Sequence, residues 1–144
     1  MVNSDTIKLL KECDAGTKMA VASIDDVLER VQDSGMKGLL QESKDHHETL
    51  GNEIHSLLNK YGKNEKDPNP MAKGMSWMKT NMKMTMDKSD ATVADLLTDG
   101  CNMGVKSLHK YLNQYKAADD TSRDICNRLV SIEETLCKDL RKYL

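Results

Sequence analysis

Apolar residues recur along four stretches of the chain at intervals of three and four positions, which is the spacing of one face of an α-helix. The positions between them are mostly polar or charged, so each stretch has a single apolar face. Such a face is stable only when it is buried, and four helices of about 25 residues bury their faces together in a four-helix bundle. The pattern therefore predicts one all-α domain over residues 1–144, with helices at about 4–32, 35–61, 90–116 and 120–143.

Residues at the expected helix ends support these boundaries. Gly62 follows the second helix, at the position where a glycine commonly ends a helix. Side chains that favour the N-cap position stand before the other three helices. The candidate caps are Asn3 or Ser4, Ser89 or Asp90, and Asp119 or Asp120.

The connections between the expected helices differ in length. The breaks at 33–35 and 117–120 are short, so the first two helices and the last two are expected to form antiparallel hairpins. The connection over 62–89 can run the length of the bundle, so the third helix can start near the start of the second. A long crossover between two hairpins is the connectivity of ferritin-like proteins, and the chain is therefore predicted to be a ferritin-like up-down bundle.

The crossover is rich in methionine. Met71, Met75, Met78 and Met82 follow one another at four, three and four positions, which predicts a short Met-rich helix. Unbranched methionine fills gaps well, so this helix is expected to pack over the bundle with Trp77 as an anchor. The same five residues form a candidate surface for docking a partner or a second copy of the chain, because Met-rich apolar faces bind adaptably.

A second interpretation of the methionines is chemical. Met82, Met84 and Met86 alternate along the sequence, and thioethers are soft ligands that suit Cu(I). A Cu(I) site at this run requires an exposed and irregular segment, whereas the helical spacing of the preceding methionines favours packing.

Composition and charge narrow the function classes. Aromatic residues make up 3% of the chain and phenylalanine is absent, which disfavours a β-sandwich or barrel. The formal charge is −2, from 21 basic and 23 acidic residues, so no global field attracts nucleic acid or anionic lipid. No apolar run approaches the roughly 20 residues of a membrane span, and no Gly-rich phosphate loop, GxSxG or HExxH motif indicates an enzyme.

The cysteines and the N-terminus predict a cytoplasmic protein. The sequence starts without a basic and apolar leader, so no secretory signal is expected. The four cysteines include no CxxC pair, which disfavours a zinc ribbon or a thioredoxin-type redox site. They are expected to be reduced, buried and apolar in behaviour.

A weak internal repeat relates the two hairpins. The segment at 13–18 (CDAGTK) shares cysteine, glycine and lysine with the segment at 101–106 (CNMGVK). Glycine inside a helix costs about 1 kcal/mol relative to alanine. Gly16 and Gly104 are therefore expected to have a packing reason, such as a close approach of two helices.

The residues for a ferritin-type metal centre are incomplete. Such centres take a carboxylate from each of two helices and Glu-x-x-His from each of the other two. His47 lies on the apolar face of the second expected helix, but Lys44 stands where its partner carboxylate belongs, and the fourth helix has no histidine. The sequence therefore predicts that an intact di-metal site is absent.

Two interpretations of the remaining polar residues stay open. The first is a weaker iron or manganese site built from His47, Asp14, Glu42 and Glu133. The second is a structural layer in which Asp14, Ser43 and His47 hydrogen-bond to one another across the bundle. The other three histidines, His46, His55 and His109, are expected at the surface.

Four segments resemble a family of small bacterial ferritin-like four-helix proteins that is known only as a domain of unknown function. They lie at 9–16 (LLKECDAG), 57–62 (LLNKYG), 71–78 (MAKGMSWM) and 90–104 (DATVADLLTDGCNMG). The resemblance covers nearly the whole chain. It implies a ferritin-like bundle that often self-associates and has no settled biochemistry.

These observations predict a non-enzymatic cytoplasmic protein that self-associates, as a dimer, or docks a protein partner. The alternatives are a metal-binding protein that uses His47 and Asp14 for iron or manganese, and a Cu(I)-handling protein that uses the methionine run.

Overall fold

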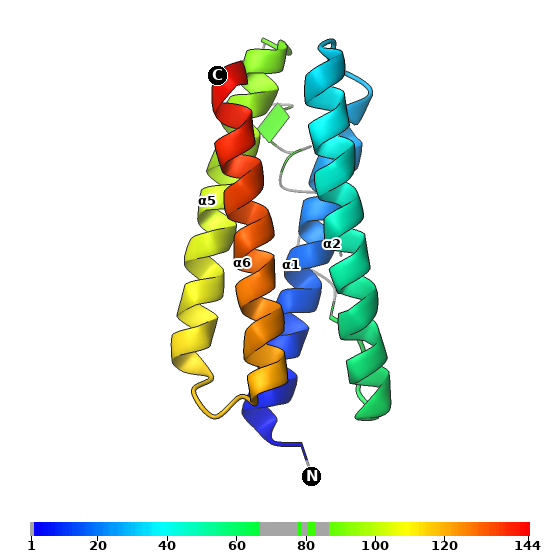
Figure 1. Cartoon of the computed structure of the whole chain (residues 1–144), viewed down its shortest axis with the longest axis vertical. Coiled ribbons are helices and arrows are strands. Elements are labelled where there is room, and N and C mark those ends of the chain that lie inside the picture. The colour runs from blue at the N-terminus through cyan, green and yellow to red at the C-terminus, as the bar shows by residue number, and fades with distance from the viewer. Residues whose placement is uncertain (1, 67–77, 79–80, 83–86) are drawn as a thin grey trace.

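The described residues form an all-helical bundle. The computed structural model describes residues 2–66, 78, 81–82 and 87–144, and over these ranges it holds four long α-helices and no strand. The elements are α1 (Ser4–Leu28), α2 (Ser34–Lys60), α5 (Asp90–Gln114), α6 (Asp120–Leu140) and the 3-10 turn η1 (Arg141–Tyr143). The predicted all-α bundle is confirmed (Figure 1).

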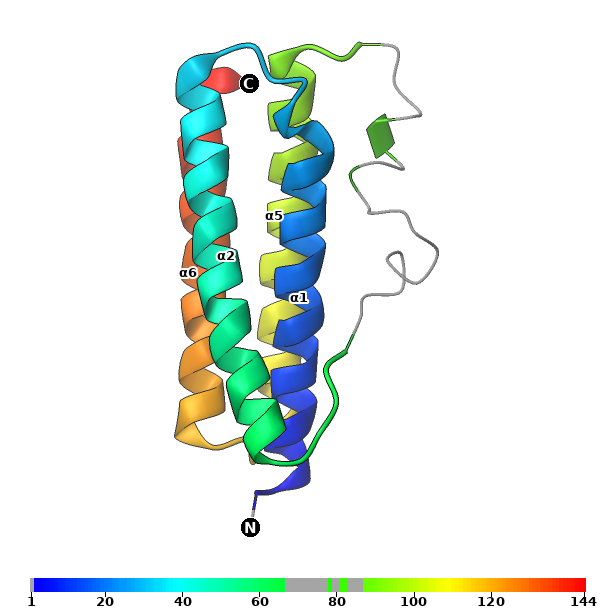
Figure 2. The same ribbon diagram turned by 90° about the vertical axis from the view of Figure 1, so that its right-hand side faces the viewer.

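The helices pair as two antiparallel hairpins, α1 with α2 and α5 with α6 (Figures 1 and 2). The start of α5 lies beside the start of α2, as the length of the crossover predicted. The carboxylate of Asp90 joins these two ends, because Oδ1 accepts from the backbone N–H of Gln32 and Oδ2 from that of Asp33, each at 2.9 Å.

Each long helix begins at a side-chain cap, which is worth about 1 kcal/mol. The caps are Asn3, Asp33, Ser89 and Asp119, and each side chain accepts a hydrogen bond from the backbone three residues on. Gly62, with φ +68°, stands just beyond the end of α2 in the left-handed conformation that favours glycine.

Some boundaries differ from the prediction. Helix α1 ends at Leu28 rather than at 32, because the chain at 32 and 33 turns to bond Asp90. Helix α5 ends at Gln114, and the last residues of the chain tighten into η1 instead of extending α6.

The core has two apolar clusters, one toward each end of the bundle. Two of the buried polar side chains, His47 and Glu133, lie at the level between the clusters. The first cluster includes Leu9, Leu10, Cys13, Ile54, Leu58, Ile125 and Leu129; the second includes Ile24, Val27, Met36, Leu40, Val93, Leu97, Leu136 and Leu140.

Two crossover methionines belong to the second cluster. Met78 is 0% exposed and Met82 is 3% exposed, so both fill gaps in the core and neither is available to a partner on this surface. Met71, Met75, Trp77, Met84 and Met86 lie outside the described residues, and so does most of the predicted Met-rich helix.

Candidate functional site

A histidine and a glutamate meet inside the bundle. His47 of α2 is fully buried, and its Nε2 lies 3.1 Å from Oε1 of Glu133 on α6. Its Nδ1 lies 2.7 Å from the backbone oxygen of Ser43, which can only accept, so Nδ1 carries a hydrogen. One further proton must then lie between Nε2 and Oε1, on either group. The pair is net neutral in both arrangements.

Cys101 of α5 lies beside this pair. Burial raises the pKa of the Cys101 thiol, and the neighbouring Glu133 carboxyl raises it further. The thiol therefore stays protonated and is a poor nucleophile.

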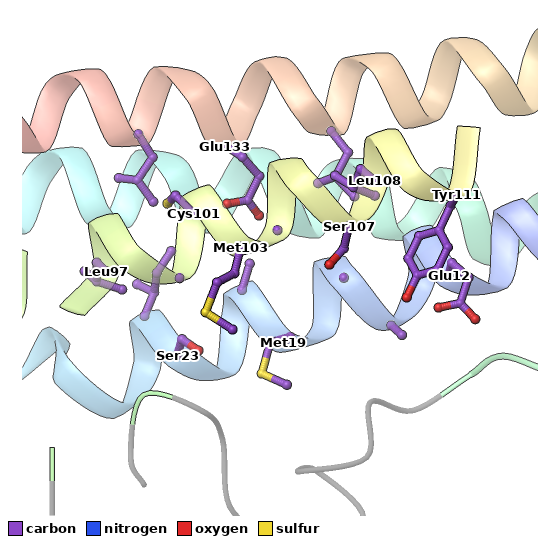
Figure 3. Close-up of a pocket in the computed structure, with 18 of the residues that line it drawn as sticks. Glu12, Met19, Ser23, Leu97, Cys101, Met103, Ser107, Leu108, Tyr111 and Glu133 are labelled. Atoms are coloured by element: carbon purple, nitrogen blue, oxygen red, sulfur yellow. The ribbon is translucent and has the colours of Figure 1, made fainter. Parts of the chain in front are cut away.

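A cavity of about 440 Å³ lies between α1 and α5 and reaches Glu133 and Cys101. Its walls carry small residues at helical spacing, including Ala15, Gly16 and Ala20 on α1 and Gly100, Gly104 and Ser107 on α5. Figure 3 shows Met103 reaching from α5 toward α1, and Glu12 and Tyr111 at one end.

The two glycines of the internal repeat both line this cavity. A Cβ at Gly16 would lie 3.4 Å from Cδ2 of Leu129, and a Cβ at Gly104 would lie 3.6 Å from Cδ of Glu133. At Gly104 this is an ordinary contact distance, so a close approach of helices does not explain that glycine, and its missing side chain leaves open space beside Glu133. At Gly16 the distance is at the tight end of ordinary contact, against Leu129 of α6.

The structure separates the four predicted metal ligands. His47 and Glu133 are in contact, whereas the fully buried Asp14 pairs with His55, whose Nε2 is 2.6 Å from Oδ1. Glu42 is exposed and lines a surface hollow beside His46. A single iron or manganese site from the four residues is therefore not assembled.

The proposed polar layer is divided in the same way. Ser43 contacts His47 through its backbone oxygen and, at 3.5 Å from Nδ1, through its side-chain Oγ, as predicted, but Asp14 belongs to a different level of the bundle. The reason is the register of the first hairpin, in which Thr17 meets Gly51 and Asp25 meets Lys44. His47 thus lies opposite residues 21–22 of α1, about 10 Å along the axis from Asp14.

His55 is the residue that sequence reasoning missed. It was expected at the surface, but its side chain is 29% exposed and holds the buried Asp14. The turn near residue 33 is the signal that could have found it. Along an antiparallel hairpin, the residue numbers of two facing positions add up to nearly the same value, so the position of the turn indicates which residue of α2 faces Asp14. His46 and His109 are exposed, as predicted.

Comparison with known proteins supports the fold and indicates no function. No family model and no curated protein matches the sequence. A conserved hypothetical protein from Mycobacterium tuberculosis, solved by crystallography, matches over the whole of both chains with a TM-score of 0.73 and 13% identity. At that identity the likeness shows the fold alone. Within the described ranges, no helix has the length and apolar character to cross a membrane.

Proposed function

We propose that the protein is a non-enzymatic ferritin-like bundle that binds a small, elongated and largely apolar molecule carrying a hydroxyl or amide donor. The observation that carries this proposal is the cavity between α1 and α5, which combines an apolar wall with the buried carboxyl group of Glu133 and has the ion pair of Glu12 with Lys66 at one end. A large apolar pocket with a few converging polar groups is the usual form of a small-molecule site.

The dimensions of the cavity support a chain-like ligand. Its volume of about 440 Å³ falls in the range of ligand pockets. Its lining on α1 runs from Glu12 to Ile24, which corresponds to about 18 Å of helix. A cavity of this length and volume is narrow, so it suits a chain better than a compact ring system.

The chemistry at Glu133 supports an uncharged ligand that donates a hydrogen bond. His47 occupies Oε1, while Oε2 lies 3.7 Å from the position of a Cβ on Gly104, on the wall of the cavity. Because the pair with His47 is net neutral, a ligand needs a hydrogen to donate rather than a charge. An anionic ligand has no hydrogen to donate to this oxygen, and its charge would lose hydration on entering the apolar part of the cavity.

The same groups support binding rather than catalysis. Both ring nitrogens of His47 are engaged and the ring is fully buried behind Glu133. The Cys101 thiol is held protonated. The ligand is therefore offered an acceptor oxygen and no activated nucleophile.

Self-association is the second candidate function. Met103, at the cavity, is 52% exposed, and Leu144 is 59% exposed. A second copy of the chain that covered Met103 would bury this apolar surface and close the cavity.

The four cysteines are free, which supports the proposed cytoplasmic location.

Octan-1-ol and octanoate are matched probes for the ligand proposal. We expect octan-1-ol to saturate a single site in saturation-transfer NMR and to raise the unfolding temperature, and octanoate to bind at least tenfold more weakly. In the double variant His47→Leu/Glu133→Leu the acceptor is absent, so the affinity for octan-1-ol should fall about fivefold or more. Equal binding of the two probes, or equal binding of octan-1-ol to both proteins, would refute the proposal.

A further inference from the structure

A second cluster of metal-ligating groups lies away from the cavity carboxyl, around Asp14. One ligand atom each from Asp14, His55 and Glu65 lie within 4.8 Å of one another. They come from α1, from α2 and from the chain just beyond α2. They are the only three such groups brought together among the residues that the structure describes.

The cluster is held in place by contacts on each member. Asp14 is 0% exposed, and its Oδ2 accepts from the backbone N–H of Lys66 at 2.8 Å. The turn at Gly62 brings this part of the chain back over α1, where the ammonium of Lys66 also pairs with Glu12. The backbone beside Glu65 is therefore fixed against α1.

A cation already occupies the centre of the cluster. The ammonium nitrogen of Lys18 lies 3.2 Å from Oδ2 of Asp14 and 3.0 Å from Oε1 of Glu65. It bridges the two carboxylates beside the imidazole of His55. Its side chain is 22% exposed and flexible, so it can turn out to solvent when another cation enters.

We propose that Asp14, His55 and Glu65 bind one divalent transition-metal ion, which displaces the ammonium of Lys18. Two carboxylate oxygens and one imidazole nitrogen suit zinc, manganese or ferrous iron. Metal–ligand bonds of about 2.0–2.2 Å require the 2.6 Å contact between His55 and Asp14 to open by less than about 1 Å. The ligand set differs from the one predicted from the sequence. None of its three members lines the cavity, although Lys66, which bonds Asp14, does.

Zinc binding to the full chain tests the proposal through the competition with Lys18. Titration calorimetry with zinc sulfate should give one ion per chain, and His55→Gln and Glu65→Gln should each weaken binding at least tenfold. The variant Lys18→Met removes the competing ammonium, so its affinity for zinc should rise about fivefold or more. Lys44→Met is the matched control, because Lys44 pairs with Asp25 at 2.7 Å across the same two helices. Its affinity should be unchanged.

NMR of the wild-type imidazoles gives a readout that needs no variant. Zinc should shift the His55 ring resonances at one equivalent, before those of the exposed His46 and His109. Binding at the exposed histidines only, binding that survives His55→Gln, or a Lys18→Met variant that binds zinc no better than wild type would overturn the proposal. The cluster would then be an ion-pair network that fixes the start of the crossover.

Discussion

At the residue scale, the pairing of His47 with Glu133 decides what a substitution costs. Neither side chain could be buried alone without leaving a polar group unsatisfied, yet together they satisfy each other at no net charge. Replacing such a pair with apolar residues is often neutral or stabilising, whereas removing one partner is strongly destabilising. The pair is therefore a test of whether these residues serve stability or binding.

We expect His47→Leu alone to lower the free energy of unfolding by about 2–4 kcal/mol, because Glu133 is left buried without its partner. The double variant His47→Leu/Glu133→Leu should lie within about 1 kcal/mol of wild type. Urea unfolding followed by circular dichroism measures both. If the double variant were as unstable as the single one, the pair would contribute to stability directly and its retention would need no binding function.

At the element scale, the apolar spacing determined which segments are helical but not how far one helix slides along the next. Leu10, Ile24 and Ile54 reach the core as the periodicity predicted. The partner of Asp14 could not be predicted in the same way. A shift of two turns between α1 and α2 keeps the apolar faces of both helices buried, but it places His47 instead of His55 opposite Asp14. The register of the two helices depends on the turn and on pairs such as Lys44 with Asp25, and the spacing of apolar residues does not predict such pairs.

Substitutions at Gly104 and Gly38 distinguish an effect on stability from an effect on ligand binding. Gly104→Ala should raise the free energy of unfolding by about 1 kcal/mol, because alanine favours the helix and its Cβ makes only ordinary contacts. The same methyl takes up space beside Glu133, so the affinity for octan-1-ol should fall about threefold or more. Gly38→Ala is the control, since a Cβ there meets nothing within 4 Å.

The expected pattern is a similar gain in stability for both variants and a loss of octan-1-ol affinity for Gly104→Ala alone. Urea unfolding and saturation-transfer NMR supply the two measurements. Unchanged octan-1-ol affinity in Gly104→Ala would place the ligand elsewhere.

At the scale of the whole molecule, the two hairpins are tied together at both ends of the bundle by side chains that bond loop backbone. At one end Asp90 accepts from two backbone N–H groups of the α1–α2 connection. At the other end the hydroxyl of Thr6, on α1, accepts from the backbone N–H of Asp119 at 2.8 Å, just before α6. Each loop thus has backbone N–H groups that are satisfied by a side chain of the opposite hairpin.

These ties predict how the bundle loses stability. Asp90→Ala and Thr6→Val should each lower the free energy of unfolding by about 1–2 kcal/mol, because backbone donors lose their acceptors. The two sites lie at opposite ends of the molecule and share no partner, so the double variant should lose the sum to within about 0.5 kcal/mol. Urea unfolding of the four proteins measures this, provided that the slope of the transition stays constant. A double variant that unfolds in two separate transitions would mean that the hairpins are independent units, and that the core clusters do not suffice to couple them.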